Sequence, residues 1–427
     1  MSAKAILSVV VFSLLILGCS SPAVTGIKVH IQNGDYARAI HLADSVLAGP
    51  EANNADVWYW KGRAHSFTRD WENSALAFAE AYRIDPSRAE EIGDFWSVFY
   101  NTANARFSQD DTDGALEMLQ TGMSISPKRP EFPQMLGDIQ LNLGEVPEAL
   151  NLFDEAFRLA AVMIGEIEAE MGRETDPARY DFLENEYYRV LSGAVLSSYN
   201  SARILESLYF RAEDPQEKAA HADRAMAILE AGLALDPMNP DLLETKAELL
   251  LVQGLFDQAL QVYDNAEQAI LQGEDEGWIT AEESREMRGA VMLTRGFALL
   301  EMERYEEALG QLEESRGLIG DSYDLLATMA HANVLLERYE QSLAILNQAM
   351  GIQGLSSSEM SNLHYMVFVN YSRLERDQAS LEALLMAIQY DSENAMYYDY
   401  LASTYSRLGR RQQAIQAMEK AEQLRRQ

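Results

Sequence analysis

The chain has 427 residues, of which 67 are acidic and 34 are basic, so its formal net charge is -33 at pH 7. A negative field of this size repels phosphate backbones and anionic lipid surfaces, which argues against nucleic acid as a partner. The length exceeds what one compact core usually holds, and it therefore predicts several domains or a repeat array.

The first elements in the chain are those of an export signal. Lys4 precedes an almost wholly apolar run over residues 5–17, which is too short to span a bilayer but is typical of a signal peptide over residues 1–18. The sequence ILGC then ends at Cys19, the one cysteine of the chain, and resembles the lipobox of bacterial lipoproteins. The resemblance implies cleavage before Cys19, acylation of its thiol with chains such as palmitate, and attachment to a membrane without crossing it.

The residue after the cysteine bears on the membrane that is used. In Gram-negative lipoproteins an aspartate at that position commonly marks retention at the inner membrane, and this chain has Ser20 there. The resemblance therefore implies a protein of the cell envelope, anchored at the outer membrane and facing the periplasm. The alternative is an ordinary signal peptide followed by a chance cysteine.

After a short lipidated linker over residues 19–23, paired helices are predicted, most clearly over residues 55–86. Apolar residues occur at helical spacing in two runs, with the polar pair Arg69-Asp70 between them, and Asp85-Pro86 ends the second run because proline cannot continue a helix. This pattern predicts a helical hairpin. It resembles the tetratricopeptide family, whose unit is a 34-residue helix-turn-helix. The residues that carry the resemblance are Trp58, Gly62, Trp71, Ser74, Phe78, Ala81 and Pro86.

Small residues then recur at intervals of 34, as from Ala103 to Gly137 and from Gly122 to Ala156. Small side chains are needed where helices cross closely, because a large one would hold the backbones apart. We therefore predict an all-α fold, a solenoid of about ten hairpins that the family resemblance implies is a right-handed superhelix. About four repeats form an N-terminal array over residues 24–163, and about six form a C-terminal array over 212–427.

A first departure from the period lies between Ala149 and Ala225, where the step is 76 residues, or 42 beyond one repeat. Because no strong helix breaker occurs before about Met171, the second helix of the fourth hairpin is expected to run on. A long helix over about 179–211 should follow, so that residues 164–211 form a helical insertion. Insertions in a solenoid usually mark function, since neighbouring repeats gain nothing from them.

A second departure lies between Ala259 and Ala308, where the step is 49 residues, or 15 beyond one repeat. It predicts a smaller insertion near residues 272–288. This segment is expected to hold an acidic loop over 273–277, followed by a helix that begins with a capping box at 280–283.

No catalytic or cofactor-binding pattern rises above background. The six histidines occur singly, and the sequence has no Gly-rich phosphate loop, no Gly-x-Ser-x-Gly and no His-Glu-x-x-His. The acidic stretch 110–114 has part of the composition of a calcium loop, but Gln109 and Gln120 stand where ligands are needed. We therefore expect no enzyme, no cofactor and no metal site. A hydrolase within residues 163–211 would need a clustered acid or nucleophile, which the segment lacks.

In tetratricopeptide arrays the first helix of each hairpin lines a concave groove that takes a peptide from a partner. The resemblance implies that the second and third hairpins contribute aromatic rings and amides, which suit a peptide or a glycan. The alternative is that the rings pack between adjacent hairpins. The expected groove residues are Tyr59, Arg63, Phe67, Tyr100, Asn101, Asn104 and Phe107.

Together these patterns predict a non-enzymatic, lipid-anchored scaffold whose partners are proteins. It would hold the components of an envelope assembly machine such as a pilus, secretion, export or outer-membrane-insertion system. The alternative is a cofactor or regulator that binds a cell-wall enzyme or peptidoglycan. Because acidic residues dominate the expected groove elsewhere, a basic or neutral partner segment is favoured.

Overall fold

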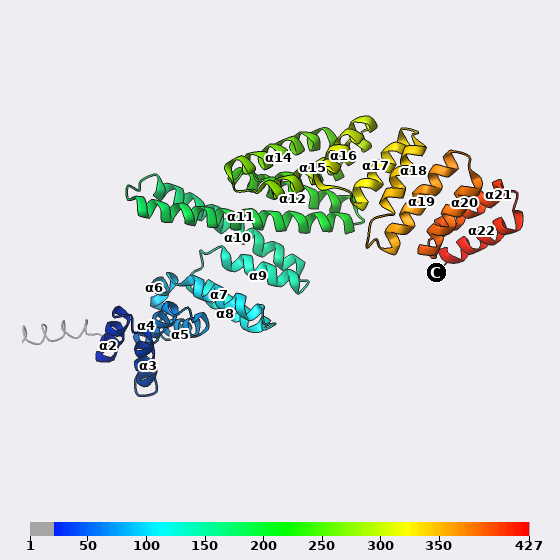
Figure 1. The fold of residues 1–427 in the computed structure, drawn as a ribbon. Helices are drawn as coiled ribbons and strands as arrows, with labels where there is room; N and C mark the ends of the chain where they lie inside the picture. The colour runs from blue at the N-terminus through cyan, green and yellow to red at the C-terminus, as the bar shows by residue number, and fades with distance from the viewer. Residues whose placement is uncertain (1–20, 427) are drawn as a thin grey trace, which may run out of the picture. The chain divides into compact units, whose positions relative to one another are not determined.

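The computed structural model describes residues 21–426, and this part of the chain is built from helices without a β-strand (Figure 1). By its contacts the chain divides into two compact units, with the boundary between Ile204 and Leu205. Within each unit successive helices pair as antiparallel hairpins, which confirms the predicted all-α repeat fold. The predicted signal peptide and Cys19 lie outside the described residues.

Unit 1 contains four hairpins, α2/α3, α4/α5, α7/α8 and α9/α10, followed by the first part of α11. Its elements are α2 (Pro22–Gln32), α3 (Tyr36–Leu47), α4 (Ala55–Phe67), α5 (Trp71–Ile84), the 3-10 turn η1 (Pro86–Arg88), α6 (Ala89–Gly93), α7 (Trp96–Phe107), α8 (Thr112–Ile125), α9 (Glu131–Asn142), α10 (Val146–Met171) and α11 (Pro177–Arg211).

Two segments of unit 1 differ from the sequence-based expectation. Pro22 is the first residue of α2 rather than part of a linker, because proline is tolerated in the first turn of a helix and Ser21 caps it. The step from Gly62 to Ala103 is 41 residues, and the extra chain forms η1 and α6 between the second and third hairpins.

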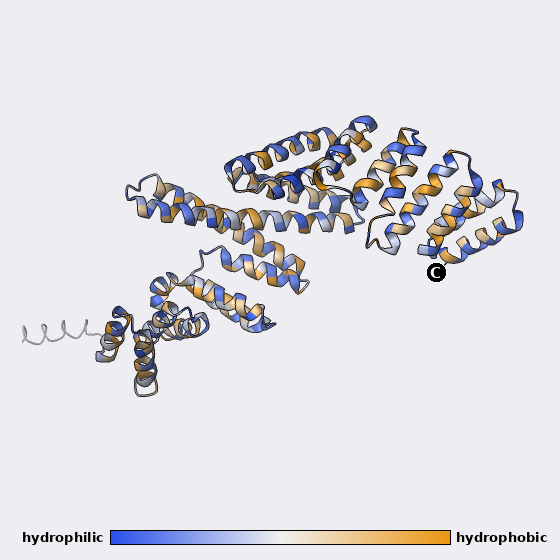
Figure 2. Ribbon diagram, viewed as in Figure 1, coloured by the Kyte–Doolittle hydropathy of each residue, from blue (hydrophilic) through white to orange (hydrophobic). Residues whose placement is uncertain are grey.

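Unit 2 continues with the end of α11 and five further hairpins, from α13/α14 to α21/α22. Its elements are α12 (Pro215–Leu235), α13 (Pro240–Val252), α14 (Phe256–Glu276), α15 (Ala281–Glu301), α16 (Tyr305–Ile319), α17 (Tyr323–Leu335), α18 (Tyr339–Ala349), α19 (Ser357–Arg373), α20 (Asp377–Tyr390), α21 (Ala395–Arg407) and α22 (Arg411–Arg425). Figure 2 shows hydrophobic and hydrophilic residues intermixed along the helices. Among residues 21–426 no helix has both the length and the apolar character needed to cross a membrane.

One column of small residues lies where the two helices of a hairpin touch. A Cβ atom added to Gly137 would lie 2.8 Å from the ring of Phe153, sixteen residues later. Gly62 meets Phe78 at 2.7 Å in the same way, and Gly296 meets a leucine at the equivalent position. These three hairpins therefore close by packing a large side chain of the second helix against glycine backbone of the first.

In the region of the first insertion, α10 runs to Met171 and α11 covers Pro177–Arg211. The second is partly different. Residues 273–276 of the expected acidic loop are the last turn of α14, and Gly277 ends that helix in the left-handed conformation. The helix continues because Gly273 is buried beneath the side chains of the following turn. The predicted capping box of Thr280 and Glu283 is confirmed at the start of α15.

The short turns inside the hairpins share one backbone feature, a residue with positive φ two positions before the second helix. In some hairpins this residue is glycine, and in others it is an L-residue for which the conformation is unfavourable. The residues are Gly34, Arg69, Asp110, Gly144, Gly254, Glu303, Glu337, Glu375 and Gly409, with φ between 57° and 84°.

Replacing Glu337 by glycine is expected to raise the free energy of unfolding of unit 2 by up to about 1 kcal/mol. The left-handed conformation costs an L-residue about 1–2 kcal/mol, and the greater freedom of glycine in the unfolded chain offsets part of this gain. Gly409→Ala is the matched control, with an expected loss of about 1 kcal/mol. Urea unfolding followed by circular dichroism measures both, and equal stability of the two variants would contradict the prediction.

A series of arginines links the second helices of unit 2. Arg338, which precedes α18, reaches Glu306 in the first turn of α16 at 2.5 Å. Arg376 reaches Glu340 of α18 at 2.7 Å in the same way. Arg410 reaches a glutamine of α20. These exposed contacts, the arginine ladder, contribute at most about 1 kcal/mol each, and they repeat with the hairpins.

Candidate functional site

The expected groove begins on α4, where Tyr59 is not an exposed side chain. Only 7% of its surface is exposed, and its ring centre lies 5.8 Å from that of Phe78. The guanidinium of Arg88, from η1, lies 5.4 Å from the Tyr59 ring. The prediction of an accessible Tyr59 is therefore wrong, because the chain between the second and third hairpins covers it. Burial also raises the pKa of the Tyr59 hydroxyl.

Arg63, one turn further along α4, is half-buried among rings. Its guanidinium carbon lies 4.5 Å from the ring centre of Trp60 and 5.6 Å from that of Phe95. Its Nε is buried and has no hydrogen-bond partner within the described chain. Arg63 thus packs between hairpins, and its stacking contacts fix it there.

Phe67 and Phe107, at the ends of α4 and α7, differ in their surroundings. Phe67 is 48% exposed and stacks on Tyr36 of α3, with ring centres 5.0 Å apart and planes at 16°. Phe107 is half-buried against the core of unit 1. Phe67 therefore marks the edge between the first two hairpins, whereas Phe107 is a packing residue.

The remaining expected residues lie together on α7. Asn104 is exposed, Asn101 is half-buried, and Tyr100 is half-buried with its ring 6.3 Å from that of Trp96. Burial, together with the nearby carboxylate of Asp138, raises the pKa of the Tyr100 hydroxyl. The structure therefore leaves one polar face of α7 accessible, and its role in binding stays a prediction.

A cluster around Trp96 is the main feature that sequence reasoning missed. The guanidinium groups of Arg129 and Arg189 lie 4.7 Å and 5.1 Å from the Trp96 ring centre. Arg189 of α11 also pairs with Glu131 of α9, and Arg129 lies 3.5 Å from Glu186 of α11. This Trp96 cluster joins α7, α9 and α11 beside Tyr100. Nothing in the sequence pattern pairs residues so far apart.

The electrostatics of the Trp96 cluster follow from its burial. Removal of water, together with the positive charge of Arg129, lowers the pKa of Arg189 to about 10. Both guanidinium groups remain charged at neutral pH. Within residues 21–426 no group of three or more His, Cys, Asp or Glu side chains is placed to hold a metal ion. The ion pairs and ring contacts of the cluster hold α7, α9 and α11 together.

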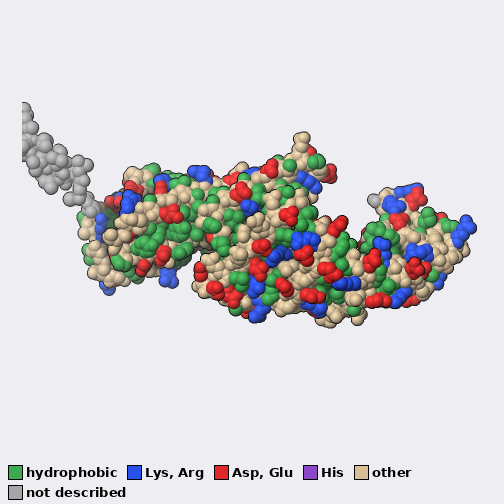
Figure 3. Space-filling view, turned by 90° about the horizontal axis from the view of Figure 1, so that it is seen from above, with side chains coloured by type: hydrophobic (Ala, Val, Ile, Leu, Met, Phe, Trp, Pro, Cys, Tyr) green, Lys and Arg blue, Asp and Glu red, His purple; other side chains and the backbone are tan. Residues whose placement is uncertain are grey.

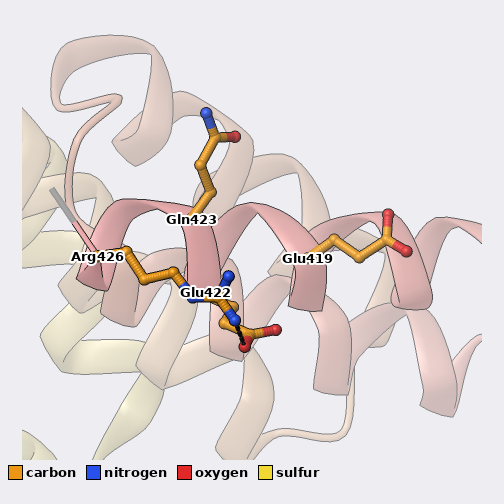
Figure 4. A pocket seen from close by; sticks show the side chains of 4 residues that line it. All are labelled: Glu419, Glu422, Gln423 and Arg426. Carbon is orange, nitrogen blue, oxygen red and sulfur yellow. Dashed lines mark hydrogen bonds and ion pairs between the residues drawn. The ribbon is translucent and has the colours of Figure 1, made fainter.

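Several hollows mark the surface. One of about 310 Å³ lies between α10 and α11, where it is lined by tyrosines and glutamates. Another, of about 380 Å³, lies where α13, the α14–α15 turn and α15 meet. A third, of about 300 Å³, is a depression on α22 beside the ion pair of Arg426 with Glu422 (Figure 4). None of these three is lined by an expected groove residue.

Charge is mixed rather than segregated on the face shown in Figure 3. On the face shown in Figure 3, acidic and basic side chains lie among one another, with hydrophobic side chains between them. This distribution agrees with the many ion pairs between neighbouring helices, such as that of Arg106 with Glu72. The excess of acid over base still leaves carboxylates without a cationic neighbour.

Comparison with known proteins gives two matches to family models of the tetratricopeptide repeat, over residues 26–89 and 397–427. No curated protein matches the chain. A solved structure of pilF from Pseudomonas aeruginosa is similar at 14% identity, covering 54% of this chain and 93% of that one, with a TM-score of 0.41. YrrB, described as a tetratricopeptide repeat protein with an unusual peptide-binding site, is 16% identical and covers 46% and 91%, with a TM-score of 0.35.

Proposed function

Because the chain belongs to the tetratricopeptide repeat family and is a scaffold for protein–protein interaction, we propose that it holds components of an assembly machine in a bacterial envelope. The observation that carries this proposal is the array of hairpins, which supplies accessible helix faces such as that of α7 with Asn104. The acidic excess of the chain favours a basic or neutral segment of the partner.

The address of the scaffold rests on the N-terminal sequence. The apolar run over residues 5–17 and the lipobox-like ILGC support export and acylation of Cys19. Because α2 begins at Pro22, the acyl chains would be attached within three residues of the first hairpin. Ser20 favours the outer membrane.

Replacement of Cys19 by alanine tests the address separately from the scaffold function. The unchanged chain is expected to fractionate with membranes and to incorporate radiolabelled palmitate, and the Cys19→Ala variant is expected to lose the label. Equal labelling of the two chains would contradict a lipid anchor at this residue.

Site-specific photocrosslinking tests the scaffold function in the full, membrane-attached chain. A benzophenone amino acid at Asn104 is expected to give adducts with a small set of envelope proteins, because this residue lies on the accessible face of a first helix. Gln120, exposed on the second helix α8, is the matched control and is expected to give none of these adducts. The same adducts from both positions, or adducts with cytosolic proteins alone, would contradict the proposal. Retention of the chain on purified peptidoglycan would support the cell-wall alternative.

A further inference from the structure

The second insertion creates a pocket around an exposed tryptophan. Its wall is formed by the start of α13 with Asp241, the α14–α15 turn with Trp278, and the first turns of α15 with Glu286. The pocket, called here the Trp278 pocket, has a volume of about 380 Å³, which falls in the range of pockets that bury a side chain or small ligand. The pocket forms because α14 and α15 are long, so the turn between them lies beside the start of α13.

Trp278 is exposed and yet held in place. Its side chain is 54% exposed, but its Nε1–H donates a hydrogen bond to Glu276 at 3.1 Å. The far edge of the indole lies against Gly273, where an added Cβ would be 2.8 Å from the ring. Ile279, the next residue, is buried in the core of the unit. A ring fixed in this way loses little conformational entropy when a ligand packs on it.

The charged groups of the pocket are all negative. Its lining includes the carboxylates of Asp241, Glu283 and Glu286 and contains no lysine or arginine. The Glu283 carboxylate accepts a hydrogen bond from the backbone N–H of Thr280. Asp241 and Glu286 form no ion pair within the described residues. Arg288 and Arg295 of α15 both pair with Glu267 of α14.

From this geometry we propose that the Trp278 pocket binds an arginine or lysine side chain of a partner protein. Tryptophan is the aromatic side chain that attracts cations most strongly through its ring face. The carboxylates of Asp241 and Glu286 would accept hydrogen bonds from the charged N–H groups of that side chain. The net charge of -33 would speed the arrival of a basic segment. The inference rests on the proposed scaffold function and names the chemistry of one contact of the partner.

The Nε1–H signals of tryptophan allow a direct test in the full chain. The chain has five tryptophans, so labelling with ¹⁵N-tryptophan gives five indole signals, and Trp278→Phe identifies the one in the pocket. The probe is the blocked tripeptide acetyl-Gly-Arg-Gly-amide, and the control probe carries citrulline, which has the same shape without the charge. The arginine peptide is expected to shift the Trp278 signal alone and to saturate, whereas the citrulline peptide is expected to leave it in place.

Charge variants complete the test. The double variant Asp241→Asn/Glu286→Gln is expected to weaken binding of the arginine peptide about tenfold. Glu282→Gln removes the same kind of charge one turn away on α15, outside the pocket, and is expected to change the affinity less than about twofold. A response to citrulline as strong as to arginine, a shift of all five signals, or an unchanged affinity of the double variant would overturn the proposal.

The outcomes separate this inference from the scaffold function. If Asn104 gives envelope crosslinks but the arginine peptide does not shift the Trp278 signal, the pocket proposal is rejected and the scaffold function is retained. A saturable shift of the Trp278 signal without any envelope crosslink would do the reverse.

Discussion

Replacement of Phe153 by alanine is expected to lower the free energy of unfolding of unit 1 by about 3–5 kcal/mol. The ring is fully buried in α10 and seats on Gly137 of α9, so its removal leaves a cavity between the two helices. Urea unfolding followed by tryptophan fluorescence measures the change, because four of the five tryptophans lie in unit 1. A loss below 1 kcal/mol would show that the hairpin does not depend on this contact.

The same contact can be tested from the other side with a double-mutant cycle. Gly137→Ala alone is expected to cost about 1–3 kcal/mol, because the new methyl group would collide with the Phe153 ring. In the Phe153→Ala background this cost should vanish, since the methyl group then occupies the cavity. Gly165→Ala, in α10 with open space around its Cβ, is the control and should gain about 0.5–1 kcal/mol. Additive costs in the cycle would contradict the contact.

Replacement of Arg189 by alanine is expected to lower the free energy of unfolding of unit 1 by about 3 kcal/mol. The guanidinium pairs with Glu131, whose side chain is only 13% exposed, and it also stacks on Trp96. Without it the Glu131 carboxylate would be left partly buried and unpaired. The loss lies at the low end for broken buried pairs because the Arg189 side chain is one-third exposed.

Two further variants separate charge from geometry at Arg189. Arg189→Lys keeps the positive charge but loses the planar group that stacks on the indole, so an intermediate loss is expected. Arg158→Ala removes an exposed pair with Glu155 on the surface of α10 and is expected to have no measurable effect. Urea unfolding of all three variants side by side gives the comparison. Equal stability of Arg189→Ala and Arg158→Ala would refute a structural role for the Trp96 cluster.

The hairpins and their lengths could be predicted from the sequence because the period itself carries the information. Small residues spaced 34 apart place several of the crossings, and the lack of a breaker before Met171 predicts the extended α10. The capping box at Thr280 is a local signal and needs no tertiary context. These features depend on residues close together in the chain or repeated along it.

The parts that could not be predicted depend on tertiary contacts. Tyr59 is buried and lies beneath Arg88 of η1, a segment without helical periodicity of its own. Gly273 looks like a loop residue by composition, yet it is helical because Trp278 packs on its backbone. The Trp96 cluster joins three hairpin levels, and no spacing in the sequence pairs its arginines with their ring.

The arginine ladder of unit 2 has a consequence for how such a chain can change its length. Arg338 and Arg376 each meet a glutamate one hairpin earlier, and Arg410 meets a glutamine, so these three junctions present the same donor to acceptors at equivalent positions. Excising the block from Tyr323 to Ser356 would bring Arg376 to Glu306, and the contact would form anew. Gene segments that encode whole hairpins can therefore be lost or copied by unequal recombination, and the arginine contact between the newly joined hairpins is kept.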